Sequence, residues 1–212
     1  MPKHPAGREE IMLRPTDRFV SDLHFSHESM VTRHGRPFET VADMDRAMIA
    51  HWNSVVADRD RVFFIGDFAF WKIPIDRLTW LRRQLHGEIH LLPGNHDPAP
   101  VLELPWASIL PDITICRQER SKERVVLSHY PLREWPFFWS GAIHLHGHTH
   151  SNLRSSNRSY DVGVDNAGFV PLTIAEIKAR MVALPNLDFT GVETADFSRD
   201  RGPDLEQAGP TP

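Results

Sequence analysis

Disulfide bonds are excluded by the composition, because the 212 residues include a single cysteine, Cys116. A lone thiol is typical of proteins that work in the reducing cytoplasm. Long apolar runs are also missing: stretches such as Val62 to Ile65 and Val125 to Leu127 are far too short to cross a bilayer. Met1 to Pro5 precede no apolar segment, so we expect no secretory signal. These features predict a cytoplasmic protein without a membrane partner.

An excess of basic residues is missing as well. The chain has 24 Lys and Arg against 28 Asp and Glu, which gives a formal net charge of −4. A dedicated nucleic-acid-binding protein typically carries a basic footprint, so nucleic acid is not the favoured partner, although bound cations would change the local field. Histidine, in contrast, is frequent, with 13 residues. Many of these histidines stand beside Asp, Asn or Gly.

The chain divides into three parts. Residues 1–14 mix charge, proline and glycine without a period, and we expect a flexible N-terminal arm. Residues 15–185 carry the periodic apolar segments of one folded domain. Residues 186–212 are rich in Asp, Gly, Pro and Thr, and we expect a tail that is mobile or lies on the surface.

Short apolar segments alternate with helical patterns inside the domain. Strands are expected at residues 18–21, 61–65 and 88–92, separated by helices at residues 41–57 and 74–86. Residues 113–116 and 124–128 are expected to pair as a hairpin, and strands at 142–146 and 160–164 continue the hairpin rhythm. A final helix is expected between Thr173 and Pro185. This order predicts an α/β sandwich with sheets inside and helices outside.

Five polar segments directly follow the expected strands. They are Asp22-Leu23-His24, Gly66-Asp67, Gly94-Asn95-His96-Asp97, Ser128-His129 and Gly147-His148-Thr149-His150. Ligands of such sheets gather at the carboxyl ends of the strands. Imidazole, carboxylate and amide groups suit Mn²⁺, Fe, Zn²⁺, Co²⁺ or Ni²⁺. The five segments together therefore predict a metal site.

The same segments resemble the calcineurin-like metallophosphoesterase superfamily, and in particular its small bacterial and phage phosphoesterases. Further matching pieces are His24 to His27, Arg36 to Phe38, Trp52-Asn53, Gly66 to Phe68 and Tyr160 to Asp165. The resemblance implies a four-layer α-β-β-α sandwich of two mixed sheets flanked by helices. It implies hydrolysis of a phosphomonoester or phosphodiester, with a nucleotide among the candidates.

The resemblance also implies a role for each matching position. Asp22, His24 and His150 would hold one divalent cation, Asn95, His129 and His148 a second, and Asp67 would bridge both. Manganese is the first choice of metal. A metal-bridging hydroxide would attack the phosphorus, with His96 as the general acid. Two cations can clamp the attacking and leaving oxygens of such a displacement.

One position departs from the pattern of the superfamily. Several of its branches carry an Asp three residues after the bridging Asp, where it orients the catalytic histidine. This chain has Phe70 there. Asp97 is the nearest replacement in the sequence.

Contacts to the substrate are expected from three further residues. Arg36 and Arg133 can bind a phosphate bidentately, with a solvated surface arginine as the alternative. His27 is a candidate for the substrate side, although hydrogen bonding to a ligand is the favoured role for His27 and His146. The aromatic loop from Trp135 to Trp139 can stack a nucleobase, pack as a plug or form an association patch.

Two other functions compete with a small-molecule phosphoesterase. The first is a nuclease acting on DNA or RNA, which the acidic balance disfavours. The second is a non-catalytic metal-binding scaffold. A scaffold that had lost its chemistry would be expected to lack ligands, whereas this chain has all of the expected ones together with His96.

Overall fold

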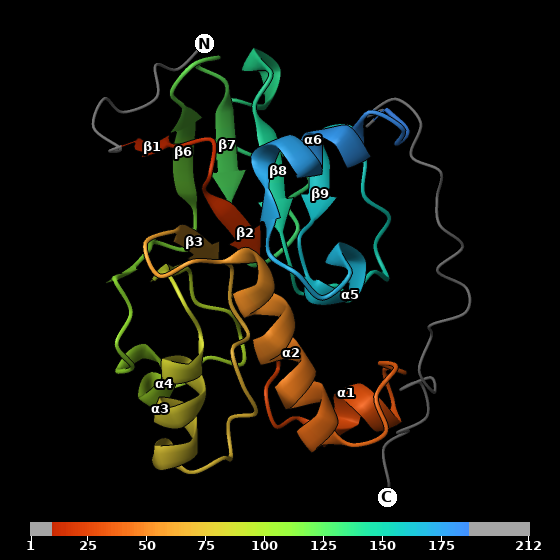
Figure 1. Ribbon diagram of the computed structural model, residues 1–212. Helices are drawn as coiled ribbons and strands as arrows, with labels where there is room; N and C mark the ends of the chain where they lie inside the picture. Colours follow the sequence, from red (N-terminus) through yellow and green to blue (C-terminus); the bar gives the residue numbers. More distant parts are fainter. Residues whose placement is uncertain (1–9, 187–212) are drawn as a thin grey trace, which may run out of the picture.

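The computed structural model of the protein describes residues 10–186 and contains two five-stranded sheets (Figure 1). The first sheet has the order β10 (Leu172–Thr173), β2 (Arg18–Val20), β3 (Arg61–Phe64), β4 (Glu88–Leu91), β5 (Ser108–Ile109). The second has the order β1 (Ile11–Leu13), β6 (Thr114–Gln118), β7 (Arg124–Leu127), β8 (Ile143–His146), β9 (Ser159–Asp161). Each sheet contains one antiparallel pair, β10 with β2 and β6 with β7. The expected α/β class with two mixed sheets is confirmed.

Among residues 10–186, six helices and one 3₁₀ turn accompany the sheets. They are α1 (Glu28–Thr32), α2 (Val41–Val55), α3 (Ile75–Gln84), α4 (Ala99–Leu102), α5 (Val164–Ala167), α6 (Ile174–Met181) and η1 (Phe138–Ser140). The long helices begin where the sequence predicts. The Thr40 side chain accepts the Asp43 N–H at the start of α2, and Thr173 and Glu176 form a full capping box at the start of α6.

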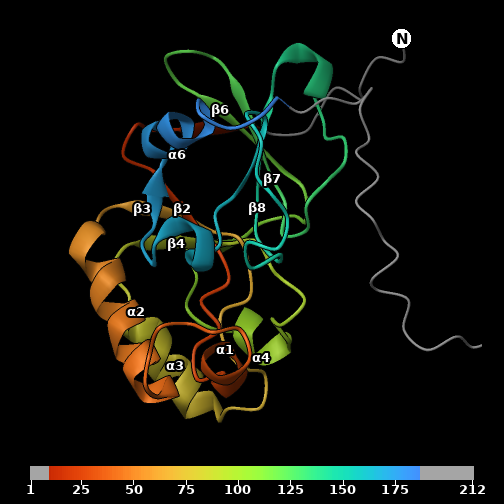
Figure 2. The same cartoon turned by 90° about the vertical axis from the view of Figure 1, so that its right-hand side faces the viewer.

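The helices α2 and α3 cover the outer face of the first sheet. Met44, Met48 and Trp52 of α2 and Leu78 and Leu81 of α3 pack there in one buried cluster. A second cluster fills the space between the two sheets and includes the buried face of α6. Figure 2 shows α1, α2, α3 and α4 gathered on one side of the sheets, with β7 and β8 beyond the first sheet.

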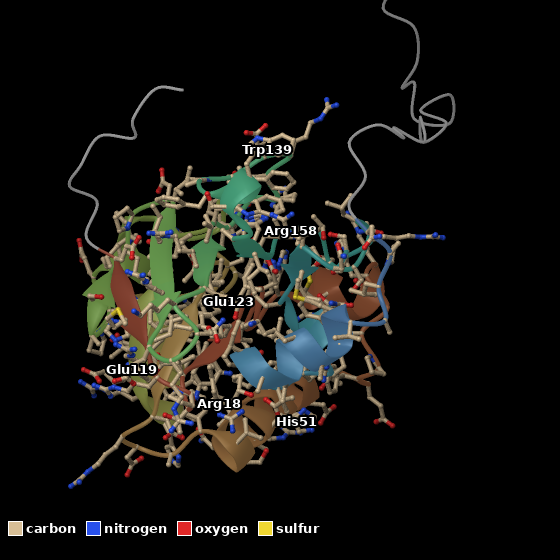
Figure 3. The ribbon with its side chains drawn as sticks, turned by 90° about the horizontal axis from the view of Figure 1, so that it is seen from above. Arg18, His51, Glu119, Glu123, Trp139 and Arg158 are labelled. Carbon is tan, nitrogen blue, oxygen red and sulfur yellow. The ribbon has the colours of Figure 1, made fainter. Side chains whose placement is uncertain are left out.

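A loop contributes to the cover of the outer face of the second sheet. Within residues 10–186, most side chains that cluster with Val126 of β7 come from the loop between β7 and β8, where Trp135 and Phe138 are buried, and Ile113 before β6 joins them. The Trp135 indole N–H donates to the Ala142 carbonyl at 2.9 Å. The aromatic loop therefore packs as a plug on this sheet, and Trp139 lies at its rim (Figure 3).

The second half of the chain corrects the expected hairpins. In the described part of the chain, only β6 and β7 form a hairpin, and β7, β8 and β9 run parallel to one another. A parallel pair needs a long crossover, and residues 128–142 and 147–158 supply the two connections. The expected strand at residues 160–164 ends at Asp161, and α5 begins at Val164.

The ends of the domain differ in part from expectation. Residues 11–13 pair with β6, so an arm that reaches residue 14 is wrong for these residues. Residues 1–9, and residues 187–212 of the tail expected over 186–212, lie outside the described range. Among the described helices, none combines the length and apolar composition needed to cross a membrane.

His144 ties the second sheet to the aromatic loop. Its ring is fully buried, stacks on Trp135 at 5.0 Å between centroids, and lies 2.8 Å from Ser128 Oγ and 3.0 Å from Ser159 Oγ. Ser128 donates its hydroxyl proton to the Tyr130 carbonyl, so it accepts from Nε2–H of His144. Burial lowers the pKa of His144 well below its usual value, so the ring is neutral in the folded protein.

This buried imidazole predicts a component of acid instability. In the unfolded chain His144 regains its ordinary pKa of about 6.5, so below that pH the unfolded state binds a proton that the folded state excludes. Stability is therefore complete above about pH 6.5 and falls with decreasing pH, by up to about 1.4 kcal/mol per pH unit from this residue. Urea unfolding in the presence of a chelator should show this extra slope in the wild type and not in His144→Gln. Equal slopes would contradict it.

Candidate metal centre

Five strand ends converge on one side of the sandwich. The strands β2, β3 and β4 run parallel in the first sheet, and β7 and β8 run parallel in the second. Each of the five expected polar segments follows one of these strands. Because parallel strands place their carboxyl ends at the same edge of a sheet, the segments meet where the two sheets face each other.

Two groups of side chains form there. The ligand atoms of Asp22, His24 and His150 lie within 4.8 Å of one another, and the same holds for Asp67, His129 and His148. We call them the first cluster and the second cluster. Each can hold a metal ion, and the grouping is the one expected from the sequence. Asn95 joins the second cluster, since its Oδ1 lies 2.9 Å from His129 Nε2 and 2.9 Å from His148 Nδ1.

Asp67 connects the two clusters. Its Oδ2 lies 3.3 Å from Nε2 of His24 in the first cluster and 3.5 Å from Nε2 of His129 in the second. Its Oδ1 accepts the backbone N–H of His96 at 2.8 Å. The Asp67 carboxylate is almost completely buried. One side chain therefore faces both candidate cation positions.

The backbone at this centre is strained. Asp22, His24, Asp67, His148 and His150 have φ angles of 59°, 50°, 63°, 72° and 47°. The left-handed conformation costs a non-glycine residue roughly 1–2 kcal/mol. Such residues persist where the surrounding structure holds them, and they concentrate at functional sites. Here hydrogen bonds between the loops hold the strained residues, including Asp22 N–H to the Gly66 carbonyl and His24 N–H to the Asp67 carbonyl.

Two glycines bring backbone against the carboxylates. A Cβ on Gly94 would lie 2.3 Å from Asp67 Oδ1, and a Cβ on Gly147 would lie 2.4 Å from Asp22 Oδ2. Any side chain at these positions would displace the carboxylate from the cluster. Glycine is therefore required beside these ligand positions, because any larger residue would collide with a carboxylate.

The electrostatics of the first cluster fit a cation. Burial raises the pKa of Asp22 to about 7, because a carboxylate without water needs a positive neighbour to stay ionised. Burial also lowers the pKa of His24 to about 3, so its ring is neutral. Within the described chain, Nε2 of His24 is buried without a hydrogen-bond partner, although it faces Asp67. A buried lone pair beside two carboxylates matches the donor set of a divalent metal.

The second cluster holds a charged pair. Burial alone would lower the pKa of His129, but the Asp67 carboxylate raises it to about 9. Burial would raise the pKa of Asp67, but its interaction with His129 holds it well below its usual value. Nδ1 of His129 donates to the Ile65 carbonyl at 2.8 Å, which turns Nε2 toward Asp67 and Asn95. A cation would replace the proton on Nε2 of His129.

Asp97 does not replace the missing acidic residue at position 70. Its two oxygens accept the backbone N–H groups of Asp67, Phe68 and Gly94, each at 2.8 Å. These bonds tie the loop after β3 to the loop after β4. Asp97 thus orients the loops that carry Asp67 and His96 and does not orient the His96 imidazole. The ring of His96 lies 5.2 Å from the His24 ring, edge to face.

The structure contradicts the phosphate contact expected for Arg36. The residue is 4% exposed, and its guanidinium forms a bidentate ion pair with Asp165 at 2.8 and 2.9 Å. Its remaining donors reach the carbonyls of Leu23 and Asp22 at 2.8 and 2.7 Å. Arg36 therefore holds the loop that carries the ligands of the first cluster.

Sequence reasoning missed the partner role of Asp165. This carboxylate lies 2.8 Å from Nδ1 of His150, so it accepts that N–H and turns Nε2 toward the first cluster. Burial would raise the pKa of Asp165, but His150 and Arg36 hold it well below its usual value. Tyr160 to Asp165 entered the sequence argument only as a matching piece. No spacing rule pointed to the contact with His150.

Asp165→Asn is expected to weaken cation binding at the first cluster by about 10–100-fold, since carboxylates that orient ligand histidines contribute this much. Calorimetric titration with Mn²⁺ measures it. Asp17→Asn is the matched control, because Asp17 is also buried and paired with an arginine, Arg61, at the opposite end of β2. Equal Mn²⁺ affinity in Asp165→Asn and the wild type would remove Asp165 from the account of this cluster.

Four other residues complete the description. His27 lies 3.4 Å from His24, nitrogen to nitrogen, which fits the expected hydrogen bonding to a ligand. His146 is buried and lies 3.0 Å from the Gly147 carbonyl. Arg133 is exposed, and its contact with substrate stays a prediction. Tyr130, which the sequence argument did not single out, is 51% exposed and packs against the His148 ring at 4.6 Å.

The fold and site define an α/β protein with two adjoining Asp/His clusters, and known proteins share this fold. A protein of unknown function from Aquifex aeolicus has a solved structure with a TM-score of 0.62 at 22% identity, covering 77% of this chain and 98% of its own. That identity shows a shared fold alone.

Relatives are also found by sequence. An uncharacterized protein from Methanocaldococcus jannaschii is 29% identical over 73% of this chain and 85% of its own length. The gene 66 proteins of Mycobacterium phage D29 and Mycobacterium phage L5 are each 28% identical, over 69% and 71% of this chain and 86% of their own lengths. No family model matches the sequence.

Proposed function

We propose that the protein is a two-metal phosphoesterase with the fold of the calcineurin-like metallophosphoesterases. The observation that carries the proposal is the position of the Asp67 carboxylate, buried between two clusters and within 3.5 Å of a histidine nitrogen from each. A single bridging carboxylate between two sets of oxygen and nitrogen donors is the arrangement expected of a binuclear hydrolytic centre.

The donor set supports manganese first, with Fe, Zn²⁺, Co²⁺ and Ni²⁺ as alternatives. When bound, two such cations supply Lewis acidity toward a phosphoryl group and lower the pKa of water toward neutrality. Asp22, His24 and His150 would hold one ion, Asn95, His129 and His148 the other, and Asp67 both. Two carboxylates against two divalent cations leave positive charge for a phosphate anion.

The remaining chemistry falls to His96. Its backbone is fixed by the bond from its N–H to Asp67, and its ring lies against His24 at the edge of the first cluster. Its side chain is partly exposed, so an ester oxygen can reach it. Histidine is the commonest general acid and base in enzymes, and His96 would give the leaving oxygen its proton.

The test is a panel of phosphomonoesters, cyclic nucleotides, dinucleotides and nucleic acids. Each is incubated with chelator-treated protein and with the same protein after addition of Mn²⁺. We expect hydrolysis of at least one small ester with Mn²⁺ and none after chelation. Protein that binds Mn²⁺ and cleaves nothing would favour a metal-binding scaffold.

The panel also tests the nuclease alternative. Cleavage of nucleic acids alone would favour it, and salt gives a second criterion. Binding of a polyanion weakens steeply with salt because counterions are released, whereas a small ester depends on salt weakly. A net charge of −4 supports the small ester.

A further inference from the structure

A row of rings leads outward from the candidate centre. The His96 ring lies 6.0 Å from the His27 ring, and His27 stacks on Phe70 at 4.8 Å with an interplanar angle of 19°. Phe70 in turn lies 6.0 Å from Trp71. We call Phe70 and Trp71, which follow the Asp67 loop directly, the aromatic shoulder.

The aromatic shoulder is not part of the hydrophobic core. Phe68 and Ala69, just before it in the chain, are fully buried, whereas Trp71 is 53% exposed. The Phe70 N–H donates to the Phe25 carbonyl at 2.8 Å, so the backbone is held where the chain leaves the core. Lys72 places its ammonium 4.5 Å above the Trp71 ring. Phe70 therefore lies against His27, the ring next to His96, and Trp71 adds exposed aromatic surface beside Phe70.

Proton donation by His96 would place the leaving group on the side of the centre where His27 and the aromatic shoulder lie. A proton donor must lie within hydrogen-bond distance of the ester oxygen that departs. The ring contacts of His96 are with His24 and His27, on the side of the first cluster. Tyr130 contacts the rings of the second cluster instead. An in-line displacement puts the attacking and leaving oxygens on opposite sides of the phosphorus, so the leaving alcohol extends from His96 toward His27 and Phe70.

We infer that the aromatic shoulder is the subsite of the leaving group, an inference that rests on the proposed function. The substrate is then a phosphate ester whose leaving alcohol carries a flat aromatic ring, as a nucleoside does. Stacking of a base on an aromatic side chain changes affinity by about tenfold or more. The exposed indole of Trp71 suits such a ring, and the Lys72 charge adds attraction to the electron-rich face of the ligand ring.

The experiment compares two ligand pairs whose six-carbon rings differ in aromaticity and flatness. Benzylphosphonate and cyclohexylmethylphosphonate, which cannot be hydrolysed, are titrated calorimetrically into Mn²⁺-loaded protein. Benzyl phosphate and cyclohexylmethyl phosphate, whose alcohols have similar acidity, are compared as substrates. We expect the wild type to favour the aromatic member of each pair by about tenfold. Trp71→Ala should remove this preference, and Phe70→Leu should reduce it.

Trp80→Ala is the matched control. Trp80 is 45% exposed and has the Arg77 guanidinium 4.5 Å above its ring, so it repeats the setting of Trp71 without any ring contact to Phe70 or His27. It should keep the wild-type preference. Two results would contradict the subsite without contradicting the phosphoesterase activity. One is loss of the aromatic preference in both tryptophan variants. The other is hydrolysis of both esters by the wild type with no aromatic preference. Absence of both binding and hydrolysis overturns the proposed function as well.

Discussion

Asp67→Asn is expected to reduce metal-dependent hydrolysis by a factor on the order of 10³ or more, because the stabilisation supplied by the two cations amounts to several kcal/mol. The amide has nearly the same shape and can still accept the His96 N–H. It lacks the negative charge that faces both clusters. The residue follows a strand end outside the hydrophobic clusters, so the fold should survive.

The measurement is kcat of the variant at saturating Mn²⁺, with metal content and circular dichroism determined on the same samples. Asp58→Asn is the control for the loss of one negative charge, since the Asp58 side chain is 87% exposed. It should behave as the wild type. A metal-saturated Asp67→Asn protein with the wild-type kcat would rule out a bridging role for this carboxylate.

His96→Ala should keep both metals yet lose activity by a factor on the order of 10²–10⁴, the usual effect of removing a general acid. The residue offers no ligand atom to either cluster, and its bond to Asp67 comes from the backbone, which alanine retains. The loss should depend on the ester. An alkyl phosphate needs a proton on its leaving oxygen, whereas a nitrophenyl phosphate releases a stable anion and should suffer less.

Kinetics on both esters, together with the metal content, separate the possible roles of His96. A larger loss on the alkyl ester at full metal occupancy supports proton donation. Equal losses would assign His96 to positioning of the phosphate, and loss of a metal ion would make it a ligand. His51→Ala, on the surface of α2, controls for removal of an imidazole elsewhere.

The core of the candidate centre could be predicted from the sequence because each ligand segment is covalently attached to a strand. Asp67 follows the apolar run of β3, and His129 follows that of β7. In the first sheet, where parallel strands were expected, their carboxyl ends must meet at a common edge, so local patterns were enough to bring Asp22, Asp67 and Asn95 together. The joining of His129 and His148 to them was implied only by the family resemblance, because hairpins were expected in the second sheet. Helical spacing of apolar residues and capping side chains at their starts placed the helices α2 and α6.

Contacts between residues far apart in the chain could not be predicted in this way. Arg36 and Asp165 are separated by 129 positions, and a guanidinium that serves the fold looks the same in a sequence as one that binds phosphate. Asp97 was known to be near His96, yet its preference for three backbone N–H groups depends on how two loops meet. Polar pairing of this kind is decided by tertiary geometry.

The second sheet shows a different limit. Apolar patterns located β7, β8 and β9, but they carry no information about strand direction. Direction followed from the long connections, one of which folds back as the aromatic plug with Trp135 on Val126. The weak pattern of Ile11 to Leu13 became a strand because β6 offered a free edge to pair with. Pairing with an edge depends on the rest of the sheet and not on local propensity.

The most direct test of the account is the stoichiometry of activation. Chelator-treated protein is titrated with Mn²⁺ while hydrolysis of a nitrophenyl ester is followed, with bound metal measured at each step. If Asp67 joins two cations in one centre, activity should be absent without metal and should reach its maximum only when two ions are bound per chain. Full activity with one bound ion or with none, or no hydrolysis at full occupancy, would contradict a two-metal phosphoesterase.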